Sequence, residues 1–276
     1  MTYKTILVHV DSGRRCPARI QLAAELAVRF DAHLAGLYAL TAGYGPASPM
    51  IVSRAEIVEG QRQRAAKQAG EVQAMFGDAV QKGGLTRAEW RVSSDDAIAA
   101  MALHARYADL VVIGQPEPEG DSGVDAAFAH RAVLAGGRPV LVVPYIGPAA
   151  TLGKRVLLAW NATREATRAM TDALPLLQSA DEVAVVMVRP RGASHGEVPG
   201  ADVGVYLARH GVRVKVDSIE APEVDAGNLL LSQAADLSSD LIVMGAYGHS
   251  RFGELVLGGA TRTIVESMTV PVVMSH

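Results

Sequence analysis

The sequence contains few aromatic residues and a single cysteine. Aromatic residues make up 5% of the 276 residues, whereas 49% are hydrophobic. The core therefore has to be built from Val, Leu, Ile and Ala, which is typical of parallel strands covered by helices. Cys16 excludes an internal disulfide and fits a reducing cytoplasm, and we expect this thiol to be an inert small residue.

An excess of positive charge and a long apolar run are also missing. The formal net charge is −3, and no basic cluster stands out, which argues against a nucleic-acid partner. The longest apolar stretch, residues 140–150, is interrupted by Pro144, Gly147 and Pro148, so no membrane span is expected. The first residues enter a strand pattern without a charged and apolar leader. These absences predict a cytoplasmic protein.

No catalytic or metal-binding constellation is recognisable. The eight histidines are scattered, and none stands at metal-ligand spacing from Cys, Asp or Glu, so no metal site is predicted. Gly248–Phe252 begins like the nucleophile elbow Gly-x-Ser-x-Gly, but Phe252 replaces the last glycine. We name no catalytic residue and expect a protein that is not an enzyme, with any ATP hydrolysis slow or absent.

Three segments of the first half recur in the same order in the second half. The aligned pairs are Lys4–Asp11 with Lys154–Asn161, Ala108–Gly114 with Ser239–Gly245, and 138–143 with 270–275. Such self-similarity indicates two copies of one domain. We place the N-terminal copy at residues 1–146 and the C-terminal copy at 153–276, with a turn-rich junction between them.

Within each copy, strand patterns alternate with helical patterns. Strands are predicted at Thr5–Val10, His33–Leu40, Glu89–Ser94, Asp109–Gly114 and Pro139–Val143, and again at Arg155–Trp160, Glu182–Val188, Arg213–Ile219, Asp240–Gly245 and Pro271–Ser275. Helices include Arg19–Phe30 and Ala55–Phe76. This alternation predicts an α/β fold with a doubly wound parallel sheet, whose ligands bind outside the carboxyl ends of the strands.

Glycines cluster after the fourth strand of the C-terminal copy. Gly245 and Gly248 follow the strand pattern, and Gly258 and Gly259 precede a helical pattern. Glycines at such a turn either simply make the turn or let the backbone approach a ligand. The N-terminus of the following helix suits phosphate, because its backbone N–H groups lack partners and carry a partial positive charge.

The spacing Gly-x2-Gly-x9-Gly, ahead of a final Pro-Val-Val strand, resembles the nucleotide-binding signature of universal stress proteins. The resemblance covers both copies. It implies two doubly wound five-stranded parallel sheets with strand order 3-2-1-4-5, and ATP or a related adenine nucleotide as the ligand. The family usually has Ser or Thr directly after the third glycine. Here Gly259 stands there, and the hydroxyl is displaced to Thr261.

The resemblance also implies which residues bind the nucleotide in the C-terminal copy. Asn161 stands where the family usually carries Asp, and its amide can still donate and accept hydrogen bonds. Val188 matches a position whose backbone meets adenine, and Trp160 either stacks on a base or belongs to the core. The full predicted set is Ala159, Trp160, Asn161, Val188, Gly245, Gly248, His249, Arg251, Gly258, Gly259, Ala260 and Thr261.

The N-terminal copy has lost this signature. Asp11 keeps the family residue, but Glu117 replaces the second glycine. Ala126 and Ala127, which follow the acidic segment 117–125, stand opposite Gly258 and Gly259. A carboxylate about 4 Å from a phosphate costs on the order of 4 kcal/mol at an effective dielectric constant near 20. Triphosphate binding is therefore not expected in this copy.

Two functions remain open at this point. The first is a stress-response regulator with a regulatory adenine nucleotide in the C-terminal copy and an unidentified regulatory protein partner. The second is a protein-interaction module that binds no nucleotide. The short apolar closing strands of both copies predict edge-to-edge pairing, either as a pseudo-dimer within one chain or as a homodimer.

Overall fold

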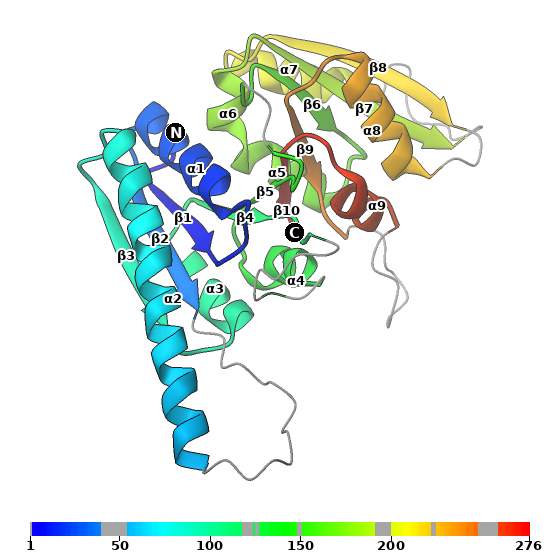
Figure 1. Ribbon diagram of the computed structural model, residues 1–276. Coiled ribbons are helices and arrows are strands. Elements are labelled where there is room, and N and C mark those ends of the chain that lie inside the picture. Colours follow the sequence, from blue (N-terminus) through cyan, green and yellow to red (C-terminus); the bar gives the residue numbers. More distant parts are fainter. Residues whose placement is uncertain are drawn as a thin grey trace.

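The computed structural model describes residues 2–39, 54–117, 124, 127–147, 151–190, 200–221, 225–247 and 259–276. The strands are β1 Thr5–Val10, β2 His33–Ala39, β3 Ala88–Ser93, β4 Leu110–Gly114, β5 Val140–Val143, β6 Arg155–Ala159, β7 Glu182–Pro190, β8 Val214–Ala221, β9 Leu241–Gly245 and β10 Val272–Ser275. The helices are α1 Cys16–Phe30, α2 Arg54–Lys82, α3 Ala97–Ala105, α4 Phe128–Ala135, α5 Arg164–Asp172, α6 Leu174–Gln178, α7 Ala201–Arg209, α8 Ala226–Asp236 and α9 Gly259–Ser267. Figure 1 shows their arrangement.

The two copies share one continuous sheet. Its strand order is β3-β2-β1-β4-β5-β10-β9-β6-β7-β8, so each copy has the predicted order 3-2-1-4-5. All pairs within a copy are parallel, whereas β5 and β10 pair antiparallel, with Leu141 opposite Val273. The two five-stranded sheets are thus halves of a ten-stranded sheet. This is the intrachain pairing that the sequence left open beside a homodimer.

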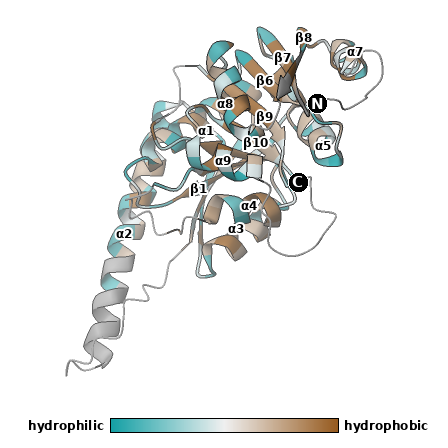
Figure 2. Cartoon of the chain, turned by 90° about the vertical axis from the view of Figure 1, so that its right-hand side faces the viewer, coloured by the Kyte–Doolittle hydropathy of each residue, from teal (hydrophilic) through white to brown (hydrophobic). Residues whose placement is uncertain are grey.

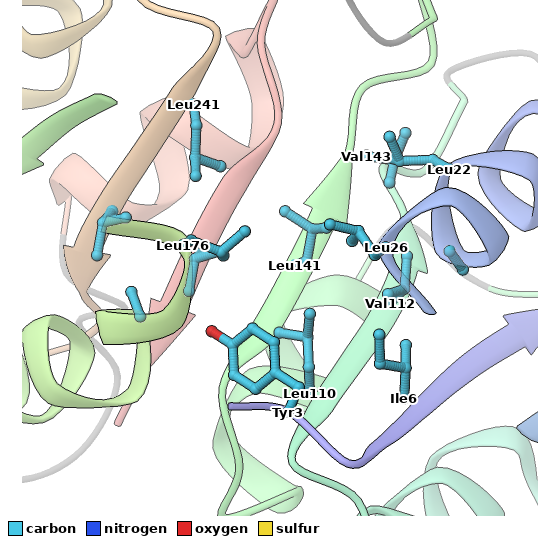
Figure 3. Close-up of a cluster of buried hydrophobic side chains, with 14 of the residues drawn as sticks. Tyr3, Ile6, Leu22, Leu26, Leu110, Val112, Leu141, Val143, Leu176 and Leu241 are labelled. Carbon is cyan, nitrogen blue, oxygen red and sulfur yellow. The ribbon is translucent and has the colours of Figure 1, made fainter. Parts of the chain in front are cut away.

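Helices cover both faces of this sheet, and two hydrophobic clusters run through both copies. One cluster lies beneath α1, α2, α5, α6 and α7, and the other beneath α3, α4, α8 and α9. Apolar residues occupy much of the strands, and the covering helices carry hydrophilic residues (Figure 2). In Figure 3, Leu141 of β5 lies between Leu26 of α1 and Leu176 of α6. Tyr3 donates its hydroxyl hydrogen bond to Asp172 O across the copies, at 2.8 Å.

All ten predicted strands are present, and their ends differ from the predicted ones by at most two residues. The first helix begins at Cys16, earlier than predicted, because Pro17 fits the first helical turn, where its missing N–H needs no partner. The predicted helix Ala55–Phe76 continues to Lys82. It ends at Gly83 and Gly84, the second of which has a left-handed φ of +64°.

A repeated aspartate fixes the start of the first strand in each copy. Asp109 accepts hydrogen bonds from two backbone amides at the start of β1, at 2.7 and 3.0 Å. Asp240 accepts from two amides at the start of β6, at 2.9 and 3.0 Å. Both belong to the aligned repeat segments, so this part of the repeat has a structural role.

Candidate functional site

The fold places one candidate site in each copy, at the carboxyl ends of the strands where the strand order reverses. In the N-terminal copy these strands are β1 and β4, and in the C-terminal copy they are β6 and β9. Ligands of doubly wound sheets bind at this point. The residue after the first strand is Asp11 in one copy and Asn161 in the other.

In the N-terminal copy, Arg19 forms an ion pair with Asp11, the carboxylate at the end of the first strand. Asp11 Oδ2 accepts a 2.7 Å hydrogen bond from Arg19 Nη2, and Arg19 Nε donates to His9 O at 2.9 Å. The Arg19 side chain is only 6% exposed. Burial alone would raise the pKa of Asp11, but the Arg19 charge and the Gly13 amide outweigh it and hold this pKa below its usual value. Asp11 is therefore a fully paired carboxylate.

Arg19 also fills the space that a ligand would need. The cavity lined by His9, Asp11, Arg19 and Gly114 has a volume of about 20 Å³, about the room of a single water molecule, whereas ligand pockets usually exceed about 300 Å³. Gly114 provides the room for Arg19, since a Cβ at Gly114 would lie 2.1 Å from Arg19 Nη1. The Arg19 side chain therefore closes the site of the N-terminal copy to a ligand.

Two further features of this closed site involve titratable groups. His9 is buried, and its Nδ1 lies 3.4 Å from Asp11 Oδ2 without hydrogen-bond geometry. Burial lowers the pKa of His9, so its ring is neutral. Glu117, the counterpart of Gly248, is 9% exposed and pairs with Arg14 Nε at 2.9 Å. The other acidic residues of the segment 117–125 lie outside the described residues.

In the C-terminal copy, Asn161 repeats the turn of Asp11 without the arginine. Asn161 Oδ1 accepts from Thr163 N at 3.2 Å and from Thr163 Oγ1 at 2.8 Å, as Asp11 Oδ1 accepts from Gly13 N. Arg19 lies eight residues after Asp11, and the corresponding residue after Asn161 is Ala169. Asn161 is exposed. Within the described part of the chain, its amide nitrogen donates no hydrogen bond.

The other predicted residues on the base and ribose side lie in or directly after β6 and β7. Ala159 ends β6 and pairs with Val186 and Met244. Trp160 is partly buried and packs against the core. Val188 lies within β7, in register with Ile219 of β8.

Gly245 has a packing role whether or not a ligand is bound. A Cβ at Gly245 would lie 2.5 Å from Ala166 N and 2.6 Å from Glu165 C, at the start of α5. A side chain here would push α5 away from β9. This close approach explains the glycine without a ligand.

The residues after β9 are held by several hydrogen bonds. Tyr247 has a left-handed φ of +60°, a conformation that costs a non-glycine residue about 1–3 kcal/mol. Its backbone N–H donates to Thr261 Oγ1 at 3.3 Å. Ala246 N donates to Ser275 O at 2.9 Å, and the His276 ring nitrogen donates to Ala246 O at 3.1 Å.

The Tyr247 hydroxyl contacts the other copy. It lies 2.6 Å from His130 Nδ1 of α4. Burial raises the pKa of Tyr247 to about 12 and lowers that of His130, so the bond joins a neutral phenol and a neutral imidazole. Sequence reasoning missed both residues, because Tyr247 stands at an unspecified position of the glycine pattern and no local signal links it to the distant His130.

The predicted phosphate-binding residues are only partly described. Gly259, Ala260 and Thr261 form the first turn of α9. The Thr261 hydroxyl is buried and engaged by the Tyr247 backbone. Gly248, His249, Arg251 and Gly258 lie outside the described residues.

A metal cluster and a membrane span are both absent from the described residues. They contain no group of three His, Cys, Asp or Glu side chains that could hold a metal ion. None of the described helices has both the length and the apolar character needed to cross a membrane.

Comparison with known proteins identifies a family and several proteins of similar fold. The model of the Universal stress protein family matches residues 2–144 and again residues 153–276. A universal stress protein from Archaeoglobus fulgidus DSM 4304 is similar over 98% of this chain and 97% of its own, with 15% identity and a TM-score of 0.71. A putative universal stress protein from Pseudomonas aeruginosa UCBPP-PA14 is similar over 99% of this chain and 93% of its own, with 14% identity and a TM-score of 0.60. No functionally curated protein matches the chain.

Proposed function

Because the chain belongs to the universal stress protein family, with one copy of the family domain at residues 2–144 and another at 153–276, we propose that it is a stress-response regulator that binds ATP or a related adenine nucleotide in its C-terminal copy. On this proposal it acts in the cytoplasm. The nucleotide is a regulatory ligand and not a substrate, and the second partner is a regulatory protein.

The observation that carries the proposal is the difference between the two strand-end residues. Asp11 is neutralised by the buried Arg19. Asn161 is exposed in an equivalent turn, with Ala169 in place of the arginine. An exposed amide can donate to and accept from a base or a ribose, whereas a carboxylate already paired with Arg19 cannot take up a ligand without breaking a buried ion pair.

We assign the remaining predicted residues to two parts of the nucleotide. The base and ribose side consists of Ala159, Trp160, Asn161 and the backbone of Val188. The phosphate side consists of Gly245, Gly248, His249, Arg251, Gly258, Gly259, Ala260 and Thr261. Backbone N–H groups at a glycine turn and at a helix N-terminus favour phosphate. Binding regulates a partner only through a difference in affinity between two conformational states.

The test is the nucleotide content and ATP affinity of the purified full chain. We expect about one ATP per chain, and the loss of this binding in Gly248→Glu, which copies Glu117 of the closed copy. Gly70→Glu is the matched control, because Gly70 lies exposed in α2 with no atom near its missing side chain. Binding that survives Gly248→Glu unchanged would contradict the assigned site.

The second candidate function is an interaction module that binds no nucleotide. Three observations favour it: Gly259 stands where the family usually has Ser or Thr, Asn161 replaces Asp, and Tyr247 already engages the Thr261 hydroxyl. The same titration separates the two candidates. Absence of ATP, ADP and AMP binding in the native chain would leave the interaction module.

A further inference from the structure

The residues that frame the proposed nucleotide site in the C-terminal copy are held by the N-terminal copy. We call residues 245–247, together with the first turn of α9 at 259–261, the C-terminal ligand loop. Helix α9 packs against α4 of the other copy (Figures 1 and 2). The two copies therefore meet directly beside the ligand loop.

The first contact is the hydrogen bond between Tyr247 and His130. Its length is 2.6 Å, and the two rings also meet edge to face, with centroids 6.3 Å apart. His130 is 8% exposed, so little water competes for this bond. The backbone of Tyr247 has a strained left-handed conformation. The hydrogen bond of its side chain to His130 therefore helps to hold the neighbouring backbone in this conformation.

The second contact reaches the far end of α9. Gln115, directly after β4, is 6% exposed. Its Nε2 donates to Val265 O at 2.8 Å and to Glu266 O at 3.2 Å, and its Oε1 accepts from Tyr145 N at 3.0 Å. Val265 and Glu266 lie in the last turn of α9, where carbonyl groups have no partner within the helix. The N-terminal copy thus caps the helix whose first turn belongs to the ligand loop.

Among the described residues, these contacts have no reciprocal counterparts. When Gly114 is aligned with Gly245, Pro116 stands opposite Tyr247, and Pro116 has no hydroxyl group. The residue that corresponds to His130 is Arg262, which pairs with Glu266 of its own helix at 2.8 Å. The N-terminal copy therefore contacts the loop of the C-terminal copy, and the aligned residues of the C-terminal copy make no equivalent contact in the other direction.

We propose that the N-terminal copy is a positioning domain for the C-terminal ligand loop, with His130 acting through Tyr247 and Gln115 acting through α9. This inference rests on the proposed function for the identity of the ligand. It gives the N-terminal copy a role although Arg19 closes its own site. His130 and Gln115 are positioning residues, because they act on the ligand through Tyr247 and α9.

The test compares Tyr247→Phe, His130→Leu and the double variant in the full chain. The first readout is amide hydrogen exchange at Ala246, Tyr247 and the first turn of α9, without nucleotide. We expect exchange about five-fold faster in each single variant, which corresponds to the loss of one neutral hydrogen bond of about 1 kcal/mol. Because both substitutions remove the same bond, the double variant should be no faster than either single variant.

The second readout is ATP affinity, which we expect to weaken by about the same factor. His130→Asn, which keeps a hydrogen-bonding group near the Nδ1 position, should restore both readouts. Tyr3→Phe is the matched control, because it removes a tyrosine hydroxyl bond between the copies, to Asp172 O, away from the loop.

Loop exchange that is equal in Tyr247→Phe and Tyr3→Phe would overturn the proposal. So would a loss of ATP binding in His130→Leu that His130→Asn does not restore. Because exchange is measured without nucleotide, a native chain that binds no ATP would overturn the proposed function alone. The exchange data would still decide whether the N-terminal copy holds the loop.

Discussion

At the scale of single residues, two positions distinguish the strand-end sites of the two copies. Arg19 closes the N-terminal site by pairing with Asp11 and by filling the space over Gly114. The C-terminal copy has Ala169 at the matching position and Asn161 at the strand end. These two differences give the N-terminal copy a buried ion pair where the C-terminal copy has an exposed amide.

We predict that Asp11 and Arg19 are strongly coupled. Asp11→Asn or Arg19→Met alone leaves a buried charge without its partner and should lower the free energy of unfolding by about 3–5 kcal/mol. The double variant keeps the volume and removes both charges, so it should cost far less than either single change. Urea unfolding of the four proteins measures the coupling. Additive losses would show that the pair is not a unit.

The same pair gives a dependence on pH. The pKa of Asp11 is lowered in the folded state, so its contribution to stability is complete above the unfolded pKa of about 3.9. This contribution is lost as the pH falls through the lower, folded pKa. Comparing urea midpoints at pH 7 and pH 3, we expect a smaller decrease in the double variant than in the native chain. Equal decreases would assign the acid sensitivity to other carboxylates.

At the scale of elements, α2 shows how one residue type has opposite effects at two positions. Gly84 ends the helix with a left-handed φ of +64°, and no neighbouring atom would obstruct a side chain. Gly70 lies inside the helix, with equally open space. The first position needs glycine for its backbone, and the second does not.

We therefore predict effects of opposite sign for the same substitution. Gly84→Ala should lower the free energy of unfolding by about 1 kcal/mol, because a left-handed conformation disfavours a Cβ. Gly70→Ala should raise it by about 0.5–1 kcal/mol, through helix propensity and a less flexible unfolded chain. Thermal unfolding of both variants provides the comparison. A stabilising Gly84→Ala would show that α2 ends differently.

At the scale of the whole molecule, two copies share one sheet and two cores. Strands β5 and β10 join the halves, and both hydrophobic clusters include residues of each copy (Figure 3). One copy closes its own site, and we propose that it positions the loop of the other. Duplication followed by divergence of the sites yields an asymmetric molecule from a repeated sequence.

We predict that both copies unfold together. Because removing either copy would expose the core and the sheet edge of the other, calorimetry should show one transition. Its enthalpy should be about 190 kcal/mol near 60 °C, from about 0.7 kcal/mol per residue, with a van 't Hoff enthalpy equal to the calorimetric one. Two resolved transitions, or a ratio near one half, would show that the copies are independent.

The sequence alone determined the repeat and the strand positions, and its family resemblance implied the strand order. The strand positions follow from apolar periodicity, which is a local property, whereas the strand order was only implied by the resemblance. Only the tertiary structure decided that Arg19 closes the N-terminal site, that β5 and β10 join the copies, and that Tyr247 meets His130. These facts depend on residues that are brought together by the packing of separate helices and strands, and nothing in the local pattern around Arg19 or His130 specifies its partner.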